Sequence, residues 1–156
     1  MRAHACAAGA GHANGARASQ ALGRSAGGFS TKIDVSVDWL GNPLRVRLSG
    51  GQRHDITHAA ALIGVLACQL VIADRGYAVV DFLDFIVEQG AQAVIPPQHR
   101  ALTSREYDTW LYRARHLVEC LINKLKHFRR VFSRYDNLAS RYLAFVQFVC
   151  ALIWLR

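Results

Sequence analysis

The chain has 156 residues and a formal net charge of +8, with 52% hydrophobic and 19% charged residues. This composition excludes a mostly disordered chain and favours one domain with its own hydrophobic core. The positive charge favours a polyanionic partner, because phosphate groups offset the repulsion among clustered arginine and lysine side chains.

The first ordered elements are expected after a glycine-, alanine- and serine-rich segment, residues 1–28, which has the composition of a flexible loop. Apolar and polar residues then alternate through Ile33–Val37 and again through Leu44–Leu48, with turn chemistry between them. This pattern predicts an antiparallel hairpin with Asp34 and Asp38 on its solvated face.

Helices and strands alternate in the rest of the chain, 54–156. The predicted elements are a helix from Asp55 (its N-cap) to Ala67, strand Leu70–Ala73 ending on Asp74, helix Val79–Glu88, strand Ala93–Ile95, a long helix from Thr109 towards Arg130 and a last helix Leu138–Leu155. A hairpin followed by this alternation predicts an α/β fold, a mixed sheet flanked by helices. The last helix is too short for a membrane span, so we expect no membrane partner and a cytoplasmic protein.

The long helix carries the residues best suited to chemistry. Tyr112, Arg115, Glu119 and Lys126 fall within roughly 60° of one another at about 100° per residue, so they form one stripe. Such a stripe suits phosphate handling, although a solvated face with ordinary ion pairs explains it as well.

A second face of the same helix is apolar and is expected to enter the core; its residues are Val118, Leu121, Ile122, Leu125, Phe128 and Phe132. Basic residues continue beyond Lys126, and the tract contains Lys124, Lys126, Arg129 and Arg130. A DNA-facing surface and a solubilising charge run both account for this tract.

The stripe, written Tyr-x2-Arg-x3-Glu-x6-Lys over Tyr112–Lys126, resembles the signature around the catalytic glutamate of insertion-sequence DDE transposases. Upstream, Leu70–Tyr77 resembles the same family's second-aspartate block, a strand that ends in Asp-Arg-Gly-Tyr. Further blocks that agree in order are Gly27–Ile33, Gly51–Asp55, Ala93–Pro97 and Ala151–Arg156.

The resemblance implies an RNase H-like fold and metal-dependent DNA cleavage and strand transfer. Two Mg²⁺ ions would be held by carboxylates, with Asp74 as the second ligand and Glu119 as the third. Tyr112, Arg115 and Lys126 would complete the catalytic set, and the implied DNA-binding residues are Arg115, Lys124, Lys126, Arg129 and Arg130. The implied partner is the double-stranded DNA of transposon ends in a bacterial nucleoid; homo-oligomerisation stays open.

In this family the first catalytic aspartate precedes a segment that resembles the opening residues, Met1–His4. The resemblance therefore implies that the first central strand and its aspartate are missing, so that 29–156 is a partial catalytic core that is inactive alone. A misassigned start, a frameshifted pair of reading frames and a decayed gene all remain open as origins. The alternative function is a non-catalytic remnant that binds DNA or a full-length transposase.

Overall fold

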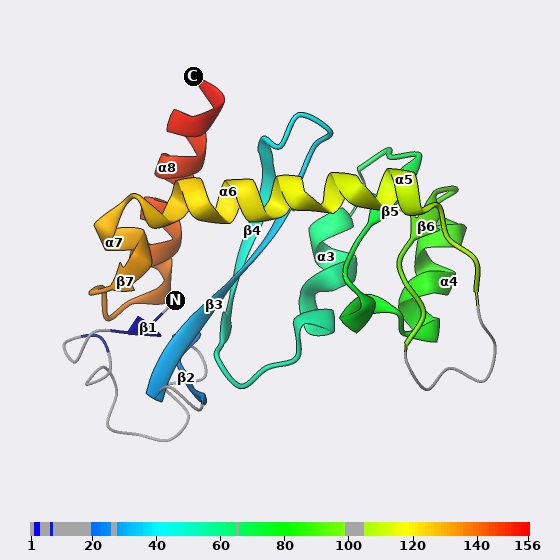
Figure 1. Cartoon of the computed structure of the whole chain (residues 1–156). Helices are drawn as coiled ribbons and strands as arrows, with labels where there is room; N and C mark the ends of the chain where they lie inside the picture. The colour runs from blue at the N-terminus through cyan, green and yellow to red at the C-terminus, as the bar shows by residue number, and fades with distance from the viewer. Residues whose placement is uncertain (1, 4–6, 8–19, 26–27, 65, 99–104) are drawn as a thin grey trace. The chain divides into compact units, whose positions relative to one another are not determined.

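The computed structural model describes residues 2–3, 7, 20–25, 28–64, 66–98 and 105–156 (Figure 1). They form helices and strands in mixed order, which confirms the predicted α/β class. The chain divides into two compact units. The first, called the hairpin unit, consists of Met1–Arg53 and Val118–Arg156. The second, called the Asp74 unit, consists of His54–Leu117.

The hairpin unit contains the predicted antiparallel hairpin, formed by β3 (Gly28–Val37) and β4 (Pro43–Gly50). In its turn the carboxylate Oδ1 of Asp38 accepts hydrogen bonds from the backbone N–H groups of Leu40 and Asn42, at 2.9 and 2.8 Å. Gly41 follows with a φ of 82°, a value that favours glycine. The Asp38 hydrogen bonds and Gly41 therefore form the turn at the position that the sequence predicts.

Short strands extend this sheet. β2 (Gly23–Ser25) pairs antiparallel with β3, and β1 (Arg2–Ala3) pairs antiparallel with β3 and parallel with β7 (Ser133–Arg134). Strand structure thus begins before Phe29. Most of the expected loop segment, 1–28, lies outside the described residues, and the boundary expected after residue 28 stays a prediction.

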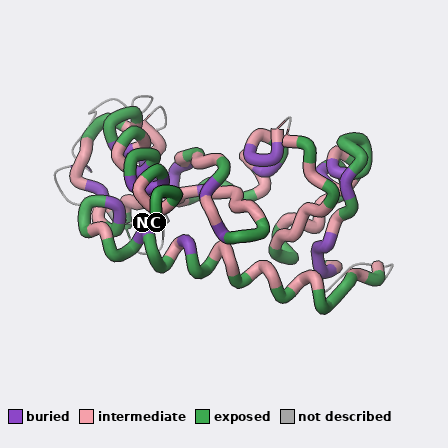
Figure 2. Tube along the Cα trace, turned by 90° about the horizontal axis from the view of Figure 1, so that it is seen from above, coloured by how far each residue is buried: buried purple, intermediate pink, exposed green. Residues whose placement is uncertain are grey.

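One face of the hairpin covers the core of this unit. The core is built by α6 (His116–Lys126), α7 (Arg129–Phe132) and α8 (Ala139–Trp154), whose buried residues appear purple in Figure 2. Those residues are Leu121, Leu125, Val131, Tyr142, Val146, Val149 and Cys150, and the hairpin packs Ile33, Val35, Val37, Val46 and Leu48 against them. The alternation therefore identifies these five residues as core-facing, while Leu44, which continues the same pattern, is 42% exposed.

The long helix ends earlier than predicted. α6 stops at Lys126, the backbone N–H groups of His127 and Phe128 bond back three residues, and α7 begins anew at Arg129. The break interrupts the helical phase, so Phe132 is 53% exposed and not in the core as predicted.

Two polar residues also differ from expectation. Asp34 is only 8% exposed and not solvated, because it lies beside Ser49, whose Oγ donates a hydrogen bond to Asp34 Oδ2 at 2.9 Å. Asp55 is the first residue of the 3-10 helix η1 (Asp55–His58), and the N-cap position belongs to His54. A shift of one residue at a helix start is small, and Asp55 still lies in the first turn.

The Asp74 unit contains a β-α-β element. β5 (Leu70–Ile72) pairs in parallel with β6 (Gln92–Val94), and α4 (Val80–Glu88) connects them. The predicted strands and helix are confirmed within two residues. The remaining elements are α3 (Ala59–Ile63), the 3-10 helix η2 (Arg75–Tyr77), α5 (Thr109–Tyr112) and the 3-10 helix η3 (Arg113–Arg115).

A separate core supports this unit. Ile86 of α4 and Ile95 after β6 are fully buried, and Ala59, Ile63, Phe82 and Ala91 complete the cluster. Gly90 adopts a φ of 74° directly after α4, which lets the chain turn into β6. No helix in the described ranges has both the length and the apolar character for a bilayer crossing.

Arg134 is a buried cation in the hairpin unit, with 0% of its surface exposed. Its guanidinium donates to the backbone oxygens of Gln20 (2.8 Å), Asp136 (2.9 Å) and Asn137 (3.0 Å) and to Thr31 Oγ1 (2.7 Å). Burial lowers the pKa of Arg134, and its hydrogen bonds to these acceptors offset the loss of water. The side chain thereby ties segments far apart in the sequence to the start of α8.

We predict that Arg134→Leu lowers the free energy of unfolding by about 3–5 kcal/mol, because several buried acceptors lose their donor together. Urea unfolding followed by circular dichroism measures the change. The matched control is Arg141→Leu on α8, where the arginine is exposed and the expected change is within about 0.5 kcal/mol. Equal effects of the two substitutions would show that the hydrogen bonds of Arg134 contribute no net stability.

Candidate active site

Asp74 follows a half-buried strand and is itself accessible. It follows β5 by two residues, with an extended backbone (φ −68°, ψ 159°), and its backbone oxygen accepts a hydrogen bond from Tyr77 N–H at 2.9 Å. The η2 turn therefore holds the main chain while the side chain remains 55% exposed. A carboxylate fixed by its backbone and open to solvent can bind a ligand with little rearrangement.

Two residues of the predicted stripe contact this carboxylate. Arg115 Nε forms an ion pair with Asp74 Oδ1 at 2.7 Å, and Tyr112 donates its hydroxyl to the same oxygen at 3.4 Å. All three residues belong to the Asp74 unit. The structure thus brings Asp74 together with Tyr112 and Arg115, although Asp74 lies 38 positions before Tyr112 in the sequence.

The local helix geometry explains why both side chains reach one oxygen. Between Tyr112 and His116 the helix narrows into η3, a 3-10 turn of three residues. In a 3-10 helix, side chains three positions apart eclipse one another, so Tyr112 and Arg115 point in the same direction. The shared direction is built into the backbone and does not depend on a flexible side-chain fit.

Residues that the motif does not contain hold Tyr112 in place. Asp108 caps α5, accepting hydrogen bonds at Oδ1 from the backbone N–H groups of Trp110 (2.8 Å) and Leu111 (3.0 Å). The ring of Tyr107 meets the ring of Tyr112 edge to face, with centroids 5.5 Å apart. Neither residue was predicted from the sequence; an aspartate directly before the predicted helix start is the signal that could have found Asp108.

The charges around Tyr112 keep its phenol protonated. Burial raises the pKa of Tyr112 and the negative charge of Asp74 raises it further, while Arg115 opposes both effects. A protonated phenol is a hydrogen-bond donor, which suits its contact with the Asp74 carboxylate. The cluster therefore consists of one carboxylate, one cation and one neutral donor.

The other predicted site residues belong to the hairpin unit. Glu119 and Lys126 are exposed on α6, one and about three turns after Arg115, and Lys126 Nζ donates to Asn123 Oδ1 at 3.4 Å. Lys124 is exposed on the same helix, and Arg129 is exposed on α7. Arg130 forms an ion pair with Asp136 at 2.8 Å. The catalytic and DNA-binding roles of these five residues stay predictions.

The residues at the site can be compared with the ligands that a divalent metal ion requires. Asp74 and Glu119 are exposed carboxylates, and carboxylate oxygens are the ligands that hard divalent cations prefer. Among the residues that the structure describes, no group of three or more His, Cys, Asp or Glu side chains could hold a metal ion. The two acidic residues fit as individual ligands, and the described part of the chain supplies no complete metal site.

The described residues thus combine an α/β fold with an aspartate after a strand that contacts a tyrosine and an arginine. Comparison with known proteins makes the class specific. Residues 11–154 match the Transposase DDE domain family, so the chain belongs to that family, as its motifs predict. Enzymes with this domain generally use divalent metal ions and act on DNA.

A relative shows the same likeness over most of the chain. A transposase assigned to insertion sequence element IS6501 of Brucella ovis is 34% identical over 132 residues, which is 82% of this chain and 100% of the relative. This likeness supports membership of the insertion-sequence transposases. No solved structure matches the chain.

The ion pair of Arg115 and Asp74 contributes little to stability, because Asp74 is more than half exposed. We predict that Arg115→Gln or Asp74→Asn changes the free energy of unfolding by less than about 1 kcal/mol. Urea unfolding of both variants and of the double variant gives the coupling energy between the two residues. A coupling of several kcal/mol would assign the pair a structural role in place of a functional one.

Proposed function

We propose that the chain carries two acidic residues, Asp74 and Glu119, of an insertion-sequence transposase active site that cleaves DNA and transfers strands. The observation that carries this proposal is the convergence of Tyr112 and Arg115 on Asp74 Oδ1. A spacing found only in sequence could be accidental. The contact between the second-aspartate block and the glutamate signature is independent of that spacing.

Mg²⁺ is the proposed cofactor, and Asp74 and Glu119 would hold it. When bound, such an ion polarises a phosphoryl oxygen and lowers the pKa of an attacking water. Hard carboxylate ligands and an aqueous setting are the conditions under which Mg²⁺ binds proteins. Both side chains are exposed, which satisfies these conditions.

The cationic and neutral donors would position the DNA backbone. Arg115 balances the charge of Asp74, and its forked guanidinium is suited to a phosphate oxygen. Tyr112 remains protonated and donates a hydrogen bond near the same carboxylate. Lys124 and Lys126 add exposed positive charge on α6. Arg129 adds positive charge on α7, so the proposed DNA-binding residues carry charge on both helices.

We also propose that the fold is RNase H-like. The order of a hairpin, a strand ending in Asp74, a helix, a second parallel strand and a long helix supports it. β5 has β6 as its one strand neighbour within the described ranges. In an RNase H-like fold, a central strand would lie at the other edge of β5.

A second candidate function is DNA binding without cleavage. It is favoured by the lack of a three-ligand acidic group among the described residues, together with the net charge of +8. In that case the chain would retain transposon ends or associate with a complete transposase and transfer no strand.

The test uses the full chain and a duplex taken from the DNA that flanks its gene. Asp74→Asn and Glu119→Gln should reduce Mg²⁺-dependent cleavage by about a thousandfold or more, since each removes a charged ligand. DNA affinity in a mobility-shift assay should change by less than about threefold, because neither residue is proposed to hold the duplex.

Matched controls are Asp81→Asn and Glu88→Gln, which remove exposed charges from α4. Both should cleave like the unchanged chain. Cleavage that survives Asp74→Asn would remove the basis of the proposal. Tight binding of the flanking duplex by the unchanged chain, without any cleavage, would select the second candidate.

A further inference from the structure

The outward side of α8 in the hairpin unit is apolar along most of its length. Residues 142–155 contain no charged side chain. Three large apolar residues at this side are open to solvent, because Phe148 is 58% exposed, Trp154 50% and Leu155 84%. A helix that packs one face into a core normally carries polar residues on the opposite face. The apolar outward side therefore indicates a contact with another apolar surface.

The exposed residues repeat at the spacing of a seam between two helices. Ala144, Phe148 and Ala151 are exposed on α8, and Leu155, its C-cap residue, continues the helical backbone. At about 100° per residue these four residues, called the seam residues, lie within roughly 60° of one another. They follow one another after four, three and four positions, which is the alternation of positions d and a in a heptad repeat.

Small and large side chains alternate along the seam, which makes it complementary to itself. In an antiparallel pair of identical helices, Phe148 of one copy meets Ala151 of the second copy, and Leu155 meets Ala144. Each layer then combines one large and one small side chain, and the pairing is reciprocal, as a twofold interface requires. In a parallel pair each seam residue would meet itself, so that Phe148 would crowd one layer and Ala151 would leave a void in another. The pattern therefore fits a second copy in the antiparallel orientation.

The charges of the chain favour the same orientation. A net charge of +8 makes two copies repel each other, and the seam is free of charge. Arg141 lies three positions before Ala144 and would be the next seam position. Parallel helices would place Arg141 beside Arg141 of the second copy, whereas antiparallel helices leave it outside the four layers. Antiparallel packing also brings opposite ends of the two helix dipoles together.

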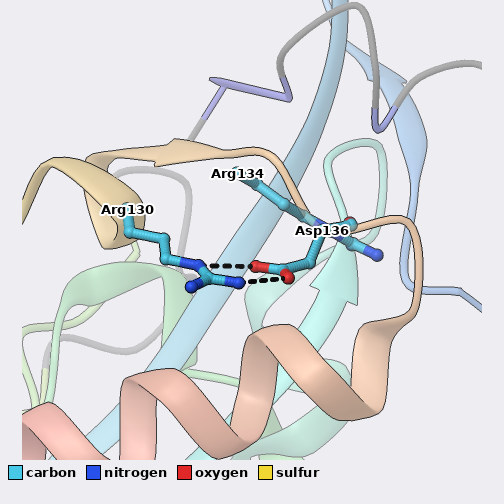
Figure 3. A network of polar contacts seen from close by, with 3 residues as sticks. All are labelled: Arg130, Arg134 and Asp136. Atoms are coloured by element: carbon cyan, nitrogen blue, oxygen red, sulfur yellow. Dashed lines mark hydrogen bonds and ion pairs between the residues drawn. The ribbon is translucent and has the colours of Figure 1, made fainter.

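α8 is held in place by contacts within the hairpin unit. Trp154 Nε1 donates a hydrogen bond to the backbone oxygen of Pro43 at 2.7 Å, which fixes the end of the helix against β4. Closer to its start, the Phe145 ring lies under the guanidinium of Arg130 at 5.1 Å, and Arg130 is itself paired with Asp136 (Figure 3). A surface that is already ordered loses little conformational entropy when it binds.

The exposed area is sufficient for a specific dimer. Leu44 follows Pro43 in β4, close to the indole of Trp154, and is 42% exposed. Together with Phe148, Trp154 and Leu155 it exposes on the order of 500 Å² of apolar surface. Two copies would thus bury roughly 1,000 Å², the size that a specific interface needs. An interface of this size corresponds to a dissociation constant in the micromolar range.

We propose that two copies of the chain associate through α8 in an antiparallel pair, with Phe148 of each copy against Ala151 of the other and Leu155 against Ala144. The interface belongs to the hairpin unit and includes none of the residues that contact Asp74. It therefore does not rest on the proposed function.

Sedimentation equilibrium of the full chain, at about 1–100 µM, tests the association. The mean mass should rise from 17.3 kDa towards twice that value. Phe148→Glu should weaken the dimer by about 30-fold or more, because it places a carboxylate in an apolar layer. The matched control is Val87→Glu on α4, where the valine is 68% exposed and lies in the other unit. It should change the affinity by less than about twofold, and circular dichroism should be the same for both variants.

An exchange of charges tests the register. Ala144→Glu and Leu155→Lys should each weaken the dimer by about tenfold, since each places a charge in two of the four layers. Combined in one chain, the two introduced charges face each other across the pair and should restore the affinity to within about threefold of the unchanged chain. Positions 144 and 155 lie about 16 Å apart along the helix, so the restored affinity cannot come from a pair within one copy.

Three outcomes would overturn the proposal. The first is a chain that stays monomeric at the highest concentration, including one that instead binds vesicles of neutral phosphatidylcholine. The second is an equal effect of Phe148→Glu and Val87→Glu, which would reduce the association to general apolar attraction. The third is a combined variant weaker than either single one, as a parallel seam requires. No DNA and no metal ion enter these measurements, so each result leaves the transposase proposal as it stands.

Discussion

The buried guanidinium of Arg134 is the constraint on which the hairpin unit depends. A cation without solvent must find hydrogen-bond acceptors or lose several kcal/mol, and Arg134 finds them at Gln20, Thr31, Asp136 and Asn137. This single requirement brings the residues before β2, the middle of β3 and the turn before α8 to one point. The position of Asp136 follows from it, and through Asp136 the orientation of Arg130.

In the Asp74 unit the backbone positions the polar side chains, whereas in the hairpin unit a buried side chain joins backbone segments. Asp74 is exposed, and Tyr112 and Arg115 beside it are half-buried. The three residues are held by backbone features around them: the η2 turn, the η3 turn and the Asp108 cap. A site made in this way leaves its functional atoms accessible while their positions are set by main-chain geometry. Buried networks give stability and exposed clusters give reactivity, and the two units divide these properties between them.

Much of the fold could be predicted because its signals are local. Alternation of two residues marks β3, β4 and their buried face, and the glycine after α4 marks its end. The end of α6 could not be predicted, because apolar periodicity continues through Phe128 and Phe132 and no proline or glycine interrupts it. The break between α6 and α7 lies close to two interactions that local sequence does not reveal. These are the hydrogen bonds of Arg134 and the ion pair of Arg130 with Asp136. Asp34 is similar, since its burial involves Ser49 on the neighbouring strand.

The candidate site also depends on a contact between residues distant in the sequence. Periodicity places Tyr112 and Arg115 on one stripe, but no local rule connects that stripe to Asp74; the family resemblance supplied the link, and the ion pair at 2.7 Å supports it. The role of Arg134 had no signal at all, because an arginine in sequence is expected at the surface.

The difference in burial between Arg134 and Arg115 bears on how the proposed chemistry could proceed. Arg134 cannot leave its acceptors without stranding them, so it is confined to a structural role. Arg115 faces a carboxylate that is 55% exposed, and an ion pair of that kind contributes only about 0–1 kcal/mol. Under the proposed function, Arg115 would exchange its contact with Asp74 for one with a phosphate oxygen, and Asp74 would be among the residues that hold the cation. The weakness of the ion pair is what makes such an exchange accessible, and a stronger, buried pair at the same position would block it.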